Sequence, residues 1–269
     1  AMVWGRGADG QGWRPVQGLD VNRDRVRLED VLPRMKGGEG FEIYIEAACN
    51  HPFGVTGFEW DDSEVHARWR SGTPGRFEMA DLVEVRSVLQ DLAWKYAFAL
   101  GLLKELPEDS PRGRVLEEAL RAATNAVGEA EPYEGAAEAA AILDAAINAP
   151  AASATVCHAV GHAHLDTAWL WPLRETRRKA MRSFSNVIRL MEREPEFCFL
   201  ASQTQQYAWL EEDAPALFAA ISERVREGRW EAGGGMWIEP DVNVPSGESL
   251  ARQMLHADRW WRSRFGEKG

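Results

Sequence analysis

Hydrophobic and polar residues alternate over residues 41–47 of this chain. The apolar positions are Phe41, Ile43, Ile45 and Ala47, with Glu42, Tyr44 and Glu46 between them. Because successive side chains of a strand point to opposite faces, this period of two predicts a half-solvated β-strand. A loop of Ser, Gly, Thr and Pro follows at residues 71–75. We therefore interpret residues 1–75 as a β-rich ancillary segment.

The hydrophobic spacing changes after this loop. Apolar or aromatic residues now recur every three or four positions, at Leu82, Val85, Leu89, Leu92 and Tyr96. This spacing is typical of one long amphipathic helix. Further helices are expected over residues 115–127 and 136–147, because breaks at three prolines bound them and the run at 136–146 is rich in alanine. Residues 76–152 thus predict a helical linker region without chemistry of its own.

Strand-like and helix-like stretches alternate beyond a predicted boundary at residues 150–153. The expected strands lie near 155–163, 197–203 and 229–237, and the expected helices near 173–193, 214–227 and 247–264. Gly228 suits a helix end with positive φ, and Pro245-Ser246 suits a helix start. Repeated βα units form a parallel sheet, either doubly wound or closed into a barrel. In both folds, ligands gather at the carboxyl ends of the strands.

The first of these strands ends in His164-Leu165-Asp166. Residues two apart on a strand share a face, so His164 and Asp166 are expected to project together. Nitrogen and oxygen donors suit Zn²⁺ or a similar divalent ion, although such a donor set also accepts Co²⁺ or Ca²⁺. The alternative is a polar strand end that binds nothing.

The third strand leads into Glu239, Asp241 and Asn243 after three adjacent glycines at 233–235. Glycine weakens a strand, so this run indicates either a bend or a place where the backbone approaches something bulky, such as a ligand. The spacing is not that of a phosphate-binding loop, and the chain has no HExxH motif.

Composition narrows the possible partners. The net charge is −11, which argues against nucleic acid because a phosphate backbone selects basic surfaces. No apolar stretch is long enough to cross a bilayer, and the first residues lack the pattern of a signal peptide. With three cysteines and no CxxC spacing, we expect a cytoplasmic location. Unpaired sheet edges would favour a homo-oligomer or the remainder of a longer chain.

Twelve tryptophans are unusual for this length, and four of them, at 169, 171, 209 and 237, fall near predicted strand ends. Such rings can stack on a sugar, or can be buried. Three motifs then carry a resemblance to the catalytic domain of glycoside hydrolase family 38 α-mannosidases, in order and spacing over about 155–265. They are Gly161-His-Ala-His-Leu-Asp-Thr-Ala-Trp-Leu-Trp-Pro172, Ser202-Gln-Thr-Gln-Gln-Tyr-Ala-Trp209 and Gly234-Gly-Met-Trp-Ile-Glu-Pro-Asp-Val-Asn-Val-Pro-Ser-Gly-Glu-Ser249. Residues 41–54 resemble the part that precedes this domain in bacterial and vacuolar-type members.

The resemblance implies that residues 153–269 are the N-terminal part of the catalytic domain, the beginning of a (β/α)7-type barrel. It implies that His164, Asp166 and Asp241 bind Zn²⁺, that Asp241 is also the nucleophile, and that Trp169 lines the mannose subsite. The implied activity is retaining, metal-dependent and exo-acting hydrolysis of terminal α-mannosyl residues of oligosaccharides. Family members place a second histidine ligand and the general acid beyond the position of Gly269, so we expect the chain alone to be inactive. Linkage preference is left open.

Two other functions fit parts of the pattern. His162-Ala-His164 is similar to the entry motif of amidohydrolase-type metal enzymes, in which both histidines bind metal. The same strand ends could also bind carbohydrate without breaking a bond.

Overall fold

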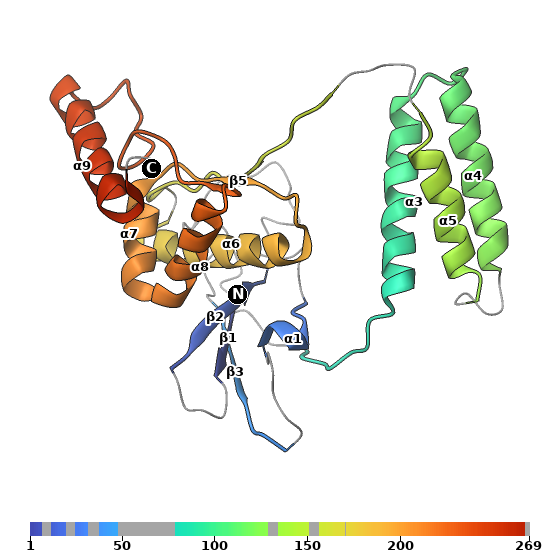
Figure 1. Cartoon of the computed structure of the whole chain (residues 1–269), viewed down its shortest axis with the longest axis horizontal. Coiled ribbons are helices and arrows are strands. Elements are labelled where there is room, and N and C mark those ends of the chain that lie inside the picture. The colour runs from blue at the N-terminus through green and yellow to red at the C-terminus, as the bar shows by residue number, and fades with distance from the viewer. Residues whose placement is uncertain are drawn as a thin grey trace, which may run out of the picture. The chain divides into compact units, whose positions relative to one another are not determined.

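The computed structural model describes residues 1–6, 12–19, 25–31, 38–47, 79–128, 134–150, 156–169 and 171–266 (Figure 1). Contacts divide the chain into two compact units. Unit 1 combines Ala1–Arg76 with His158–Gly269, and unit 2 is Phe77–Cys157. The first and third predicted segments, 1–75 and 153–269, therefore fall largely within one unit, and the division into three segments stays a prediction.

Unit 2 is helical. It contains α3 (Ser87–Glu105), α4 (Pro111–Val127) and α5 (Ala136–Ile147). Leu92, Leu116 and Leu143 are buried at its centre, together with a set of alanines whose small side chains let the helices approach closely. Ser110 begins α4 by accepting a hydrogen bond from the Gly113 N–H at 2.8 Å. The predicted helices are confirmed, but α3 starts at Ser87 and leaves Leu82 exposed.

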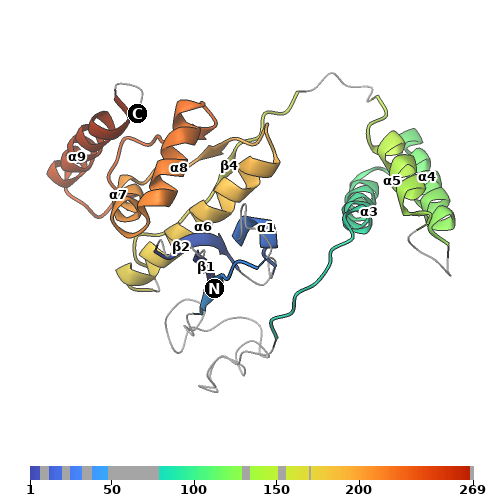
Figure 2. The same ribbon diagram turned by 60° about the horizontal axis from the view of Figure 1, so that its bottom comes forward.

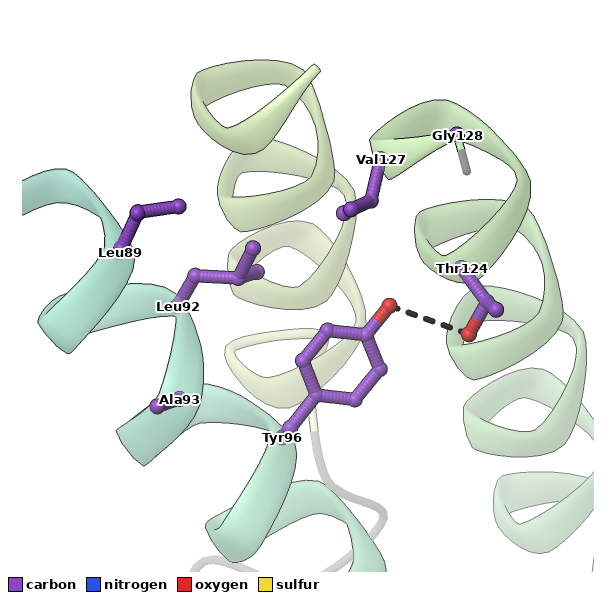
Figure 3. A pocket seen from close by; sticks show the side chains of 7 residues that line it. All are labelled: Leu89, Leu92, Ala93, Tyr96, Thr124, Val127 and Gly128. Carbon is purple, nitrogen blue, oxygen red and sulfur yellow. Dashed lines mark hydrogen bonds between the residues drawn. The ribbon is translucent and has the colours of Figure 1, made fainter. Parts of the chain in front are cut away.

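A pocket of about 360 Å³ opens between α3 and α4 of this unit (Figure 3). Its polar groups are the Tyr96 hydroxyl and Thr124 Oγ1, which form a hydrogen bond of 3.1 Å. The other lining residues are apolar or glycine, at 89, 92, 93, 127 and 128. The lining therefore offers no carboxylate, imidazole or thiol.

The N-terminal part of unit 1 is a three-stranded antiparallel sheet. Its order is β2-β1-β3, formed by β1 (Met2–Arg6), β2 (Arg14–Gly18) and β3 (Glu42–Glu46), with the short helix α1 (Leu28–Val31) beside it. The predicted strand near 41–47 is confirmed as β3. Both Ile43 and Ile45 remain about 40% exposed, so the alternating pattern does not produce a buried face.

The second sheet of unit 1 is parallel and carries the βα alternation. Its strands are β4 (Gly161–His162), β5 (Phe199–Leu200) and β6 (Trp230–Glu231), in that order. The helices are α6 (Leu173–Arg193), α7 (Thr204–Asp213), α8 (Pro215–Arg226) and α9 (Gly247–Phe265).

The alternation and three helices are as predicted, while the strands are far shorter. A strand extends only where its backbone can pair with a neighbouring strand. In the part of the chain that the structure describes, β4 pairs only with β5. The described residues form a mixed α/β structure and no closed barrel, so the (β/α)7-type barrel stays a prediction.

An aromatic core packs between the helices and the parallel sheet. Phe184, Phe199, Tyr207 and Trp230 are each at most 3% exposed, with neighbouring ring centroids as close as 4.8 Å. The Tyr207 hydroxyl accepts a hydrogen bond from Trp230 Nε1–H at 2.7 Å and donates one to the Ala201 carbonyl at 2.8 Å. The core therefore fixes β5, β6 and α7 relative to one another.

The N-terminal sheet packs on α6 (Figure 2). Gly18, at the end of β2, donates its N–H to Asn186 Oδ1 at 2.9 Å. A Cβ at Gly18 would lie 2.9 Å from Cβ of Arg182 and 3.0 Å from its carbonyl oxygen. Glycine is therefore required at this position for β2 to approach the helix.

The glycine run allows a close approach, as one of the two predicted alternatives required, and the neighbour is part of the protein. Gly234 has φ +137°, and a Cβ there would lie within 2.6 Å of both Cβ and the carbonyl oxygen of Ser202. The bulky neighbour is thus the protein's own backbone after β5. Among the described residues, no helix combines the length and the apolar character needed to span a membrane.

Candidate active site

The candidate site lies just past the carboxyl ends of the three parallel strands. His164 and Asp166 follow β4, Ser202 follows β5, and Glu239 and Asp241 follow β6. Because parallel strands end at the same edge of a sheet, three distant segments bring their polar residues to one place.

His164 is the centre of this arrangement. Its Nε2 lies 3.2 Å from Asp166 Oδ1, and its Nδ1 lies 2.7 Å from Glu239 Oε2. The other oxygen of Glu239 accepts a hydrogen bond from the Ser202 hydroxyl. We call these four residues the His164 cluster. It connects the ends of all three strands, and the predicted proximity of His164 and Asp166 is found.

The two carboxylates control the protonation of the imidazole. Partial burial alone would lower the pKa of His164, but the hydrogen bond with Asp166 and the charge and hydrogen bond of Glu239 together raise it above its ordinary value. A neutral imidazole has one N–H, whereas both ring nitrogens here face carboxylate oxygens. In this arrangement the doubly protonated ring satisfies both neighbours. A metal bound at Nε2 would replace the proton there, and Glu239 would still hold the N–H of Nδ1.

In the described part of the chain, no hydrogen bond or ion pair links Asp241 or Trp169 directly to the His164 cluster. One carboxylate oxygen of Asp241 accepts the N–H of Asn243 at 3.2 Å, and the side chain is exposed. Trp169 is 54% exposed and packs edge-on against Trp171, with ring centroids 5.4 Å apart. The roles assigned to His164, Asp166, Asp241 and Trp169 from the sequence stay predictions.

The donor set for a metal is incomplete in this arrangement. Across the residues that the structure describes, no group of three or more His, Cys, Asp or Glu side chains is gathered as a metal site. A catalytic zinc site uses three protein ligands, and His164 and Asp166 provide two. The Nδ1 of His162 is engaged by the backbone, in a hydrogen bond of 2.9 Å with the Leu200 carbonyl.

Glu239 and Ser202 are the polar residues of the cluster that the sequence analysis did not assign to the site. Glu239 carried a signal, because it stands two positions before Asp241 just after a predicted strand. Ser202 stands at a predicted strand end and begins the second of the three motifs, but the sequence analysis gave it no role of its own. Their pairing with His164 depends on the order of strands in the sheet.

Comparison with known proteins finds a family match over the part of the chain that contains the His164 cluster. Residues 154–269 match the family described as the glycosyl hydrolases family 38 N-terminal domain. The chain is 32% identical to human alpha-mannosidase 2C1 and 31% identical to alpha-mannosidase G of Dictyostelium discoideum, in each case over 99% of this chain. It is 48% identical over 115 residues to the alpha-mannosidase of Saccharomyces cerevisiae, which covers 42% of this chain and 11% of that protein.

The chain spans about a quarter of the first two relatives, namely 26% of the human protein and 25% of the Dictyostelium protein. The similarity to them extends through the helical unit and the N-terminal sheet. The family match covers the parallel sheet, its helices and the whole His164 cluster. Residues 154–269 therefore belong to the glycosyl hydrolases family 38 N-terminal domain.

Proposed function

We propose that this chain is part of an α-mannosidase, a glycosidase that removes terminal α-mannosyl residues from mannose-containing glycans. The observation that carries the proposal is the His164–Asp166 pair at the end of β4, joined to the segments after β5 and β6. The names of the relatives support mannose as the substrate. The cytoplasmic location and the homo-oligomer stay predictions.

The proposed reaction is exo-acting and retaining. Asp241 would attack the anomeric carbon, and a second carboxyl group, about 5–5.5 Å from it in retaining enzymes, would protonate the leaving oxygen and later activate water. The exposure of Asp241 supports the nucleophile role, since substrate can reach its carboxylate. Trp169 offers an exposed indole face, which suits the apolar face of a sugar ring.

The proposed cofactor is one divalent ion, Zn²⁺, held by His164, Asp166 and Asp241. When bound, such an ion supplies a Lewis acid that orients and polarises oxygen ligands. Because the described arrangement brings only two of these donors together, we derive no reaction step through the ion. His164 and Asp166 present a nitrogen and an oxygen donor 3.2 Å apart, and Glu239 fixes the orientation of the imidazole from its other side.

Titration of the 269-residue chain with Zn²⁺ alone, followed by calorimetry, tests the donor set. His164→Ala and Asp241→Asn should each weaken the affinity at least tenfold, because either change removes a ligand. His162→Ala is the matched control and should leave the affinity unchanged, because the proposed donor set does not include His162. Loss of binding in His162→Ala together with retention in Asp241→Asn would refute the proposed site and favour an amidohydrolase-type centre.

Titration with methyl α-D-mannoside, with Zn²⁺ and then with EDTA, tests the substrate. Binding that requires the ion supports the mannosidase proposal. Binding that is indifferent to EDTA would instead indicate a plain carbohydrate-binding surface. Turnover of an aryl α-mannoside by this chain alone would overturn the expectation that the general acid lies outside it.

A further inference from the structure

Buried polar side chains form hydrogen bonds with the loop that carries the candidate site. This loop, residues 163–169, exposes His164 and Trp169 to solvent and contains Asp166 between them. We infer that Thr176, Gln203 and Gln206 are positioning residues that fix the shape of this loop for sugar binding. This inference rests on the proposed function.

Two buried glutamines hold the same carbonyl group. The Leu165 carbonyl accepts one hydrogen bond from Gln203 Nε2 at 2.7 Å and another from Gln206 Nε2 at 2.9 Å. Gln203 also accepts a hydrogen bond of 2.7 Å from the Thr167 hydroxyl. The two glutamines are 4% and 2% exposed. Leu165 stands between His164 and Asp166, so its peptide groups set the directions of both site residues.

Thr176 holds the next part of the loop with a single hydroxyl. Its Oγ1 donates to the Asp166 carbonyl at 3.1 Å and accepts from Ala168 N–H at 3.1 Å and from Trp171 Nε1–H at 2.9 Å. The side chain is fully buried in the first turn of α6. A hydroxyl has one donor and two acceptor positions; two of them are used here on the loop and the third on Trp171.

The loop needs this support because its backbone is strained. Ala168 has φ +63°. Among the described residues, it is the one residue other than glycine that has a positive φ. For alanine the left-handed region is unfavourable, because Cβ comes too close to the following carbonyl oxygen. A strained conformation persists only where its surroundings determine it. The Ala168 N–H is held by Thr176, and its neighbour in sequence is the exposed Trp169.

A role in positioning explains why these three side chains are polar. Burial of an amide or a hydroxyl stabilises little in comparison with an apolar side chain of similar volume. It does specify one conformation when every polar group is satisfied. Here, the hydrogen bonds end on the backbone of residues 165, 166 and 168 and on the side chains of residues 167 and 171. A displacement of about 1 Å at a site can reduce activity about a hundredfold.

The test compares Thr176→Val, which keeps the shape and removes the hydroxyl, with Thr176→Ser, which keeps the hydroxyl. Gln206→Met is a second variant of similar volume. The measurements are amide hydrogen exchange at Ala168 and the affinity for methyl α-D-mannoside in the presence of Zn²⁺. Thr176→Val should accelerate exchange at Ala168 at least tenfold, and Thr176→Val and Gln206→Met should each weaken sugar binding at least tenfold. Thr176→Ser should resemble the unaltered chain in both measurements.

Gln17→Met is the matched control for the loss of a buried glutamine. Gln17 is 2% exposed and donates to the Arg25 carbonyl at 2.7 Å, away from the loop. It should lower the melting temperature and leave both exchange at Ala168 and sugar affinity unchanged. The inference is overturned if Thr176→Val and Gln206→Met lower the melting temperature in the same way without changing either exchange or affinity. If the unaltered chain binds no mannoside, the proposed function fails, and exchange at Ala168 alone decides whether Thr176 fixes the loop.

Discussion

Replacement of Tyr207 by phenylalanine removes one oxygen atom from beneath the candidate site. This hydroxyl is fully buried and connects Trp230 Nε1–H with the Ala201 carbonyl, at 2.7 and 2.8 Å. Phenylalanine fills nearly the same space, so the packing of the ring is preserved. The variant leaves a buried N–H and a buried carbonyl without this partner.

The size of the effect follows from these two groups. A buried donor or acceptor that loses its partner costs about 1–3 kcal/mol. For the indole N–H and the carbonyl together, we expect Tyr207→Phe to lower the free energy of unfolding by roughly 2–4 kcal/mol. That is a large share of the 5–15 kcal/mol that is typical of a whole domain.

The loss also depends on pH in a predictable direction. Burial raises the pKa of Tyr207 far above its ordinary value, and the hydrogen bond from Trp230 offsets only part of this shift. As the pH rises above 10, the unfolded chain loses the phenolic proton and the folded chain keeps it. The contribution of Tyr207 is therefore complete below pH 10 and declines above it by about 1.4 kcal/mol per pH unit. The difference between the unaltered chain and Tyr207→Phe should shrink accordingly.

The assay is urea unfolding at pH 8 and pH 10.7, followed by near-ultraviolet circular dichroism of the aromatic core. Tyr44→Phe is the control, since Tyr44 is 54% exposed and its replacement should change stability by less than about 0.5 kcal/mol. A loss below about 0.5 kcal/mol in Tyr207→Phe at pH 8, or a difference that is equal at both pH values, would refute the reasoning.

Two further predictions concern packing and charge. Gly18→Ala should destabilise unit 1 by about 1–3 kcal/mol, because the added methyl group would collide with Cβ and the carbonyl oxygen of Arg182. Gly12→Ala is the control and should have little effect on the urea midpoint, since no described atom lies within 4 Å of the new Cβ. Lys95→Met should destabilise unit 2 by at most about 1 kcal/mol, because it removes the 2.7 Å ion pair with Asp144 that joins α3 to α5. The pKa of Lys95 is raised, chiefly by its hydrogen bond to Asp144, so this contribution is complete below pH 10.5 and is lost above it. An equal loss in 1 M NaCl would contradict the ion-pair interpretation.

Local patterns were sufficient for most of the described helices, with α1 and α7 as exceptions. The strongly amphipathic stretch 173–193 was predicted and is found as α6 with the same ends. In such a helix the apolar face alone indicates which side is buried. Gly228 and Ser246 were also read correctly, with φ +73° and a side-chain hydrogen bond to Ser249 N–H, because both effects are local.

Features that depend on distant partners were missed. No helix was predicted between the strand near 197–203 and the helix near 214–227, whereas residues 204–213 form α7 and bury Gln206. The sequence shows a glutamine but not the Leu165 carbonyl that it binds. The contact between Glu239 and His164 likewise depends on the sheet order, in which β4 and β6 both pair with β5 and so bring the segments that follow them together. The lengths of β4, β5 and β6 were overestimated, because the extent of a strand depends on the strands that pair with it and not only on its own residues.

The split of unit 1 across the chain affects its synthesis. Gly18 binds Asn186, 168 positions later, whereas unit 2 is continuous in sequence. At a translation rate of about 5–20 residues per second, roughly 10–30 s pass between the synthesis of Gly18 and the synthesis of Asn186 in α6. During that interval the helices of unit 2 can already have folded on the ribosome, while the strands upstream of them still lack α6, on which they pack, and are open to chaperones and to other nascent chains.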